Sequence, residues 1–133
     1  MGLTRAKLMV SNPRESNRAA MQIDALVDTG ALHLCVPEHV SLQLGLIELE
    51  KREVTLADGK KQLCSYCGPV LIEFNGRHCF TGALILGDEV LLGAIPLEDM
   101  DLVIHPATRS LMANPASPNI PSASAKGVRR NGK

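Results

Sequence analysis

A short acidic turn, Asp28-Thr29-Gly30-Ala31, is the feature that most constrains this chain. It follows the alternating apolar run 21–27, a pattern that predicts a half-buried strand. A carboxylate on a tight turn behind such a strand is held rigidly and partly shielded from water, as an acid/base catalyst should be. Gly30 tolerates unusual backbone angles, and the Thr29 hydroxyl can bond a neighbouring backbone group. We expect Asp28 to be catalytic; an Asp that only bonds its own backbone is the alternative.

A second motif gives this turn its context. The segment 90–94, Val-Leu-Leu-Gly-Ala, follows another apolar strand and runs into a short helix that ends near Met100. Gly93 predicts tight packing between that helix and a strand. The two motifs together are more specific than either alone.

The rest of the sequence predicts one small, mostly β domain. Aromatic residues make up only 2% of the 133 residues, so the core must be aliphatic. Asp58-Gly59 and Asn75-Gly76 predict tight hairpins, and Gly68-Pro69 predicts a break between strands. About eight short strands and one or two short helices indicate a closed or nearly closed β-barrel. The expected strands lie near 3–10, 20–27, 33–36, 53–57, 60–66, 70–74, 79–86, 102–104 and 111–113, and a helix is expected at 38–44.

The order of these features resembles the retropepsin-like (clan AA) aspartic proteases, in particular small bacterial single-domain relatives of the retroviral proteases. The shared pattern is an Asp-Thr-Gly-Ala turn, a mid-chain hairpin, and a hydrophobic-hydrophobic-Gly motif before a helix. It covers roughly residues 3–115. The resemblance implies an acid-protease-type β-barrel, and an endopeptidase in which two Asp28 carboxylates activate a water molecule. This chain has a single Asp-Thr-Gly, so the second Asp28 must come from an identical chain in a homodimer.

The resemblance also assigns roles to other residues. Thr29, Gly30 and Ala31 would form the catalytic turn, with Leu92 and Gly93 supporting it from beneath. The hairpin tip, made of Ala57, Asp58, Gly59 and Lys60, would be the flap that closes over an extended peptide substrate. The strands 3–10 and 111–113 would interleave in the dimer. No cofactor or metal is implied.

Two departures from the retroviral pattern stand out. Many retroviral proteases pair an acid, two places after the motif's Gly, with an Arg that follows the later Gly; here these positions are Leu32 and Ala94. Loss of both partners together fits replacement of an ion pair by an apolar contact. The second departure is the flap tip, which is charged where retroviral flaps are rich in glycine.

Composition argues against several other partners. Lys126, Arg129, Arg130 and Lys133 lie in the last eight residues, and the remaining ten basic residues face fourteen acidic ones. The body, with few aromatic side chains, is therefore unsuited to nucleic acid. Residues 116–133 are expected to be a flexible Pro/Ser/Ala-rich tail with a basic end, outside the domain 1–115. No apolar run is long enough for a membrane span and no signal-peptide pattern is present, so a cytoplasmic protein without membrane partners is expected.

Alternative chemistries have weaker signals. Cys64 and Cys67 form one C-x-x-C within a predicted strand, whereas thiolate zinc sites favour two such pairs, so buried or half-exposed free thiols are expected. His33 is expected to be a strand residue rather than a partner of Asp28, and Glu98, Asp99 and Asp101 a solvated helix end. The main functional alternative is a non-catalytic dimeric module of the same fold that binds a peptide or protein.

Overall fold

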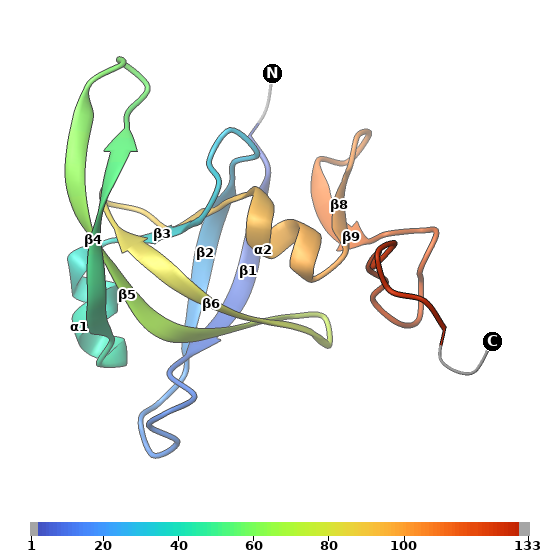
Figure 1. Ribbon diagram of the computed structural model, residues 1–133, viewed down its shortest axis with the longest axis horizontal. Helices are drawn as coiled ribbons and strands as arrows, with labels where there is room; N and C mark the ends of the chain where they lie inside the picture. Colours follow the sequence, from blue (N-terminus) through green and yellow to red (C-terminus); the bar gives the residue numbers. More distant parts are fainter. Residues whose placement is uncertain (1–2, 131–133) are drawn as a thin grey trace.

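The computed structural model describes residues 3–130, which form nine strands and two short helices (Figure 1). Lys133 of the basic end and the first two residues lie outside this range. The elements are β1 (Arg5–Ser11), β2 (Met21–Val27), β3 (Leu34–Val36), α1 (Glu38–Leu44), β4 (Ile47–Thr55), β5 (Lys61–Phe74), β6 (Arg77–Ile85), β7 (Leu91–Leu92), α2 (Ala94–Asp99), β8 (Leu102–His105) and β9 (Ser110–Ala113).

The seven-stranded sheet closes on itself. Its order is β1-β2-β7-β3-β6-β5-β4, and β5 also pairs with β1, where Met9 lies opposite Glu73. The expectation of a mostly β, nearly closed fold is therefore confirmed, as a ring-like sheet with two helices. β8 and β9 form a separate two-stranded sheet beside it (Figure 1).

The core inside the ring is aliphatic, as the composition predicts. Along β1 buried and exposed side chains alternate, so that Leu8 and Val10 point inward while Lys7 points out. Phe80 is 69% exposed and is not part of this core. The largest fully buried side chains are Leu8, Leu34, Leu44, Ile72, Leu92 and Met100.

The helix α1 has the predicted bounds. Pro37 precedes its first turn, and Gly45 ends it with a left-handed backbone (φ 66°), which glycine adopts without a steric penalty. Its buried side chains, Val40, Ser41 and Leu44, cover the sheet. Among the described residues no helix is long and apolar enough to span a membrane.

Three predicted boundaries are wrong. The strand expected at 53–57 begins at Ile47 instead, because residues 47–52 pair with β5 although most of their side chains are exposed. Gly68-Pro69 does not end a strand, since β5 runs through it for 14 residues. The β5–β6 register shifts between Cys67 and Val70, where the missing N–H of Pro69 is tolerated. The third strand begins at Leu34, so His33 precedes it.

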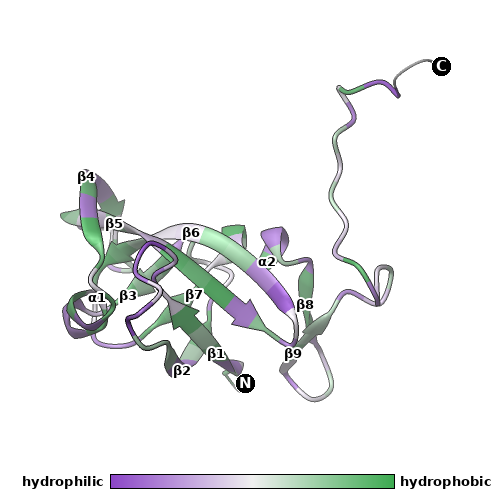
Figure 2. Ribbon diagram, turned by 90° about the horizontal axis from the view of Figure 1, so that it is seen from below, coloured by the Kyte–Doolittle hydropathy of each residue, from purple (hydrophilic) through white to green (hydrophobic). Residues whose placement is uncertain are grey.

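The β4–β5 hairpin projects from the ring, and the chain after β9 leaves the body of the molecule in the opposite direction (Figure 1). The hairpin loop has five residues, 56–60, rather than the two expected at Asp58-Gly59. Figure 2 shows the chain that follows β9 running away from the sheet, and residues 114–130 contain no helix or strand.

Candidate functional site

The Asp28 turn (residues 28–31) lies at the end of β2, where the chain leaves the sheet. The Asp28 N–H donates to the Leu92 carbonyl at 3.0 Å, which continues the pairing of β2 with β7 by one residue. The Asp28 Oδ1 accepts a hydrogen bond from Gly30 N at 2.9 Å, and Ala31 N donates to the Asp28 carbonyl at 3.1 Å. The half-buried carboxylate is therefore fixed by its own turn, with its other oxygen, Oδ2, unbonded to any described residue.

The expected hydrogen bond of the Thr29 hydroxyl is not present in this turn. Thr29 and Gly30 are exposed, while Ala31 is half-buried. The Thr29 hydroxyl makes no hydrogen bond within residues 3–130, so it does not lock the turn in the single chain. The exposed Thr29 hydroxyl is therefore free to contact solvent or another molecule.

The Leu92-Gly93 motif supports the turn from beneath, and Gly93 is the residue that permits the close approach. A Cβ added at Gly93 would lie 2.3 Å from the His33 carbonyl oxygen and 2.8 Å from that of Ala31. Because those neighbours are backbone, no side-chain movement could relieve the clash. Ala94 N donates to the Ala31 carbonyl at 2.9 Å, which ties the two segments together.

A cleft of about 780 Å³ lies between the Asp28 turn and the arm of the β4–β5 hairpin. Asp28, Gly30 and Ala31 line it on one side, and residues 52–57 line it on the other. Of the four predicted flap residues only Ala57 belongs to the lining. Asp58, Gly59 and Lys60 lie at the exposed tip, where Asp58 Oδ1 accepts from Lys60 N at 2.9 Å. The arm of β4, rather than the tip, is therefore the cleft wall.

The cleft floor is apolar and comes from strands far apart in sequence. Leu84, Leu86 and Leu91 form it together with Leu32 and Cys35. No sequence signal distinguishes the three floor leucines, since strand alternation alone cannot say which face of a closed ring meets a cleft.

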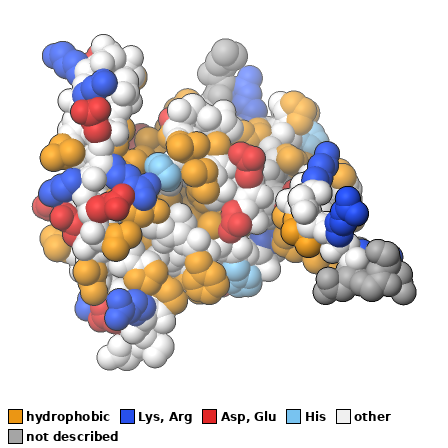
Figure 3. All heavy atoms as spheres, in the orientation of Figure 1, with side chains coloured by type: hydrophobic (Ala, Val, Ile, Leu, Met, Phe, Trp, Pro, Cys, Tyr) orange, Lys and Arg blue, Asp and Glu red, His pale blue; other side chains and the backbone are white. Residues whose placement is uncertain are grey.

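A cationic group also lines the cleft. The Arg52 guanidinium carbon lies 3.7 Å from the centroid of the Tyr66 ring, and His33 meets the same ring edge-on at 5.8 Å between centroids. Arg52 and His33 line the cleft with Asp28. Figure 3 shows basic, acidic and histidine side chains gathered where the projecting hairpin meets the body. Arg52 and Tyr66 could not be predicted as site residues, because a cross-strand stack has no local sequence pattern.

Comparison with known proteins agrees with this geometry. No protein-family model matches the sequence, and no curated protein matches it. Among solved structures, the EIAV protease complexed with the inhibitor HBY-793 is similar over 74% of this chain and 88% of that chain, with a TM-score of 0.58 and 19% identity. The retroviral protease-like domain of Ddi1 from Leishmania major is similar over 86% of this chain and 91% of that chain, with a TM-score of 0.55 and 13% identity.

This chain has the retropepsin fold. At such identities the likeness establishes the fold and not the activity. Within the retropepsin fold, the Asp28 turn, the Leu92-Gly93 motif and the projecting hairpin lie in one region, as the sequence pattern predicts.

The histidine and the nearby thiol of this retropepsin-fold cleft are both held uncharged near neutral pH. Burial, together with the charge of Arg52, lowers the pKa of His33. Burial raises the pKa of Cys35 to about 11, with smaller contributions from Cys64 and Asp28. A protonated, buried thiol is a poor nucleophile, so Cys35 is not suited to nucleophilic catalysis.

The four cysteines are free and buried, as expected. Cys64 packs with Cys35 and Leu84, whereas the Cys67 thiol contacts Ser41 of α1, so the two members of the C-x-x-C have different surroundings. Within residues 3–130 no group of three or more His, Cys, Asp or Glu side chains could hold a metal ion.

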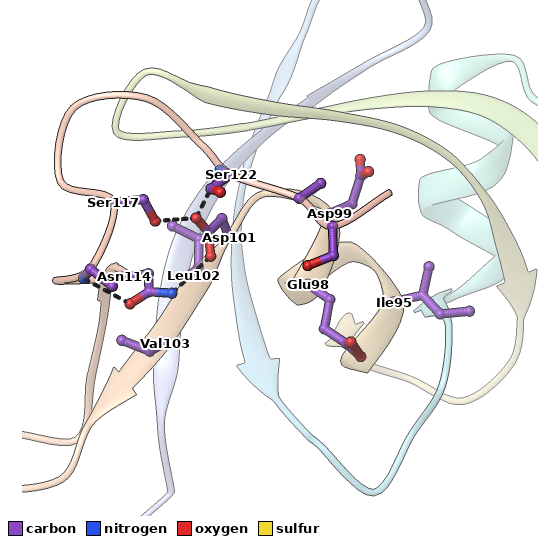
Figure 4. Close-up of a pocket in the computed structure, with 12 residues that line it drawn as sticks. Ile95, Glu98, Asp99, Asp101, Leu102, Val103, Asn114, Ser117 and Ser122 are labelled. Atoms are coloured by element: carbon purple, nitrogen blue, oxygen red, sulfur yellow. Dashed lines mark hydrogen bonds between the residues drawn. The ribbon is translucent and has the colours of Figure 1, made fainter. Parts of the chain in front are cut away.

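A second hollow, of about 790 Å³, lies beside α2 (Figure 4). Its central carboxylate is Asp101, which accepts hydrogen bonds from the Ser117 hydroxyl, from Asn114 Nδ2 at 3.0 Å and from Ser122 N at 2.9 Å. These hydrogen bonds, with Ser117 the strongest, lower the pKa of Asp101 to about 2. The expectation that Asp101 is a solvated helix-end residue is wrong, although Glu98 and Asp99 are exposed as predicted. The Asp101 carboxylate therefore links the end of α2 to residues 114–122.

Proposed function

We propose that this protein is an aspartic-type endopeptidase that works as a homodimer, with one Asp28 from each chain forming the catalytic pair. The observation that carries the proposal is the position of Asp28, on a turn fixed by backbone hydrogen bonds, at the wall of a cleft that a projecting hairpin covers. The fold it shares with the EIAV protease supports the same assignment.

The chemistry requires two chains. In a carboxylate pair that shares one proton, the ionised member takes a proton from the attacking water while the protonated member polarises the scissile carbonyl. Each chain has one Asp28, and no other acidic side chain lines its cleft except Glu53, which pairs with Lys61 at 3.6 Å. A twofold axis beside the turn would bring the second Asp28. This chemistry needs no cofactor.

The surface beside the Asp28 turn suits such an interface. Leu32 is 59% exposed and Ile95 is 40% exposed, and Ile95 N donates to the Leu32 carbonyl at 2.9 Å. Exposed leucine and isoleucine next to a polar site are typical of a protein interface. Leu32 and Ala94 stand where many retroviral proteases have a paired acid and Arg, so this surface is apolar where those proteases have an ion pair.

The substrate would be an extended peptide. It would lie along the cleft with its scissile bond beside Asp28, and the leucines of the floor would contact its apolar side chains. The β4 arm would close over the peptide and exclude water from the reacting groups.

The test is cleavage of a diverse peptide library between pH 4 and pH 8 by the wild type and by Asp28→Asn. Asp24→Asn, a change of the same kind at an exposed residue of β2, is the matched control. We expect cleavage by the wild type and by Asp24→Asn, and none by Asp28→Asn. Equal behaviour of all three proteins, each confirmed as a dimer by mass, would contradict the proposal and favour the non-catalytic peptide-binding module.

A further inference from the structure

The cleft that contains Asp28 also contains a basic side chain to which the proposed peptidase chemistry gives no task. Arg52 comes from the β4 arm and lines the cleft together with Asp28 and His33. It faces across the cleft from the Asp28 turn, because residues 52–57 and 28–31 form opposite walls. An arginine in this position is placed to contact whatever peptide lies there.

The guanidinium of Arg52 is held in one orientation by the protein. Its flat face lies on the Tyr66 ring at 3.7 Å, and its Nε donates to Glu50 Oε2 at 2.7 Å. The Tyr66 ring is itself confined: a Cβ added at Gly82 would lie 2.3 Å from it, and His33 packs against its edge. A stacked and hydrogen-bonded guanidinium loses less conformational freedom when a ligand binds.

Most of the hydrogen-bonding capacity of Arg52 is unused. Arginine has five N–H donors, and the hydrogen bonds made within residues 3–130 account for the Nε donor alone. The terminal nitrogens therefore have no partner in the described chain. Two parallel N–H groups on a fixed plane match the two oxygens of a carboxylate.

We propose that Arg52 is a specificity-determining residue that binds a carboxylate of the peptide in the cleft. The part of its test that measures peptide cleavage rests on the proposed peptidase function. The carboxylate is that of an Asp or Glu side chain near the scissile bond, or that of the peptide's own C-terminus; both present the same pair of oxygens.

The other charges around Arg52 leave this role open to it. Glu50 accepts a hydrogen bond from Nε of Arg52, which leaves the edge formed by the two terminal nitrogens free. Glu53 pairs instead with Lys61 at 3.6 Å. His33 is held neutral by burial and by Arg52 itself, so Arg52 is the cation that lines the cleft. Glu50 is the one carboxylate of the described chain that bonds Arg52, so the guanidinium can still bind a carboxylate of the substrate.

The cleavage arm compares wild type, Arg52→Gln and Lys51→Gln on a library of octapeptides with acetylated and amidated ends. Lys51 is the matched control, since it precedes Arg52 on β4 and carries the same charge, but bonds Ser65 and Glu48 outside the cleft. We expect acidic residues to be enriched at one position next to the cut in wild type and in Lys51→Gln. Exchange of that Glu for Gln should lower kcat/KM about tenfold, as for other charge-assisted hydrogen bonds, and Arg52→Gln should abolish the difference.

A second library with free C-terminal carboxylates separates the two sources. Enrichment of acidic side chains in the blocked library assigns the site to a side chain. A preference that exists only with free ends, for cuts a fixed number of residues from the C-terminus, assigns it to the terminal carboxylate. No preference in either library, or one that survives Arg52→Gln, would overturn the inference.

A binding arm keeps this inference separable from the peptidase proposal. The same libraries are captured on Asp28→Asn protein and on Asp28→Asn/Arg52→Gln protein, and the bound peptides are identified by mass spectrometry. Enrichment of carboxylates by the first protein alone supports the Arg52 site even if wild type cleaves nothing. Equal retention by both proteins would refute it, and circular dichroism of each variant confirms that the fold is intact.

Discussion

At the scale of single residues, Gly93 shows how strictly one position can be determined. Its backbone angles are ordinary (φ −87°), so the need for glycine comes from space and not from conformation. The carbonyl oxygens of Ala31 and His33 occupy the place of a side chain. The sequence predicted a tightly packed glycine here, and the structure identifies the Asp28 turn's own backbone as the group packed against it.

We predict that Gly93→Ala destabilises the protein by about 1–3 kcal/mol, because an added methyl group would force backbone apart as overpacking does. Urea unfolding followed by circular dichroism measures the change. Gly127→Ala is the control, since a Cβ at Gly127 meets nothing within 4 Å. Similar urea midpoints for the two variants would show that the backbone of the turn can move to accommodate the added methyl group.

The residue whose surroundings the sequence predicts least well is Asp101. Its neighbours Glu98 and Asp99 are exposed, and a run of acids after a helix normally indicates a solvated end. Asp101 instead has a left-handed backbone (φ 56°), which directs its carboxylate toward residues 114–122. Local sequence could not reveal this, because the partners lie 13–21 positions later.

We predict that the Ser122 amide NMR signal of wild type titrates with an apparent pKa of about 2, the value for Asp101, to which that amide donates. The pKa is below that of an unfolded Asp, so the stability from these bonds is present above about pH 4 and is lost as pH falls from 4 to 2. Asp101→Asn should remove the titration. A midpoint near 4 would mean that the hydrogen bonds to Asp101 do not persist in solution.

At the scale of elements, the strands that the sequence predicts best are those with one buried face. β1 alternates cleanly, and its observed bounds, Arg5–Ser11, lie within two residues of the 3–10 expected from that alternation. β4 is predicted worst: Ile47 and Leu49 are exposed, and the strand exists through its backbone pairing with β5. Burial leaves a pattern in the sequence, whereas edge pairing does not.

This contrast predicts different costs for the same substitution. Leu8→Ala in β1 removes a fully buried side chain and should cost about 2–5 kcal/mol, whereas Leu49→Ala in β4, 74% exposed, should stay within about 0.5 kcal/mol. Chemical denaturation of both variants is the measurement. A large loss from Leu49→Ala would indicate that β4 is covered in solution, for example by a second chain.

For the segment after Asn114, composition predicts flexibility poorly. Its Pro, Ser and Ala content predicts a flexible tail, and its described part has no helix or strand. Yet the buried Arg77 guanidinium donates to the Asp101 carbonyl at 2.9 Å and to the Ser117 carbonyl, which joins the first part of this segment to the fold. We propose that the flexible tail begins beyond Ser122.

At the scale of the whole molecule, the retropepsin fold and the Asp28 site follow from a few spaced motifs, but the cleft does not. The turn, the glycine and the hairpin could be located because each has a local signature. The cleft's apolar floor depends on the long-range pairing that brings β3, β6 and β7 together, and the Arg52–Tyr66 stack depends on the register of β4 against β5. Long-range closure of this kind is what a single sequence specifies least directly.

If the active unit holds two copies of Asp28, inactive chains should interfere with active ones. We predict that a ninefold excess of Asp28→Asn chains, allowed to exchange with wild type, lowers cleavage per wild-type chain to roughly a tenth, because most wild-type chains then have an inactive partner. An equal excess of Asp24→Asn should not lower it. Unchanged activity with Asp28→Asn would point to a catalyst complete within one chain.

The closure of the ring also bears on how these molecules behave when crowded. Because β5 pairs with β1, the seven-stranded sheet ends at β4, whose outer edge has no partner in the described chain. Unpaired edges are where sheets of different molecules join into aggregates. β4 carries Glu48, Glu50, Lys51, Arg52 and Glu53 in close succession, so two such edges would bring charged side chains into contact. The charged edge strand should therefore oppose the stacking of native molecules into fibrils.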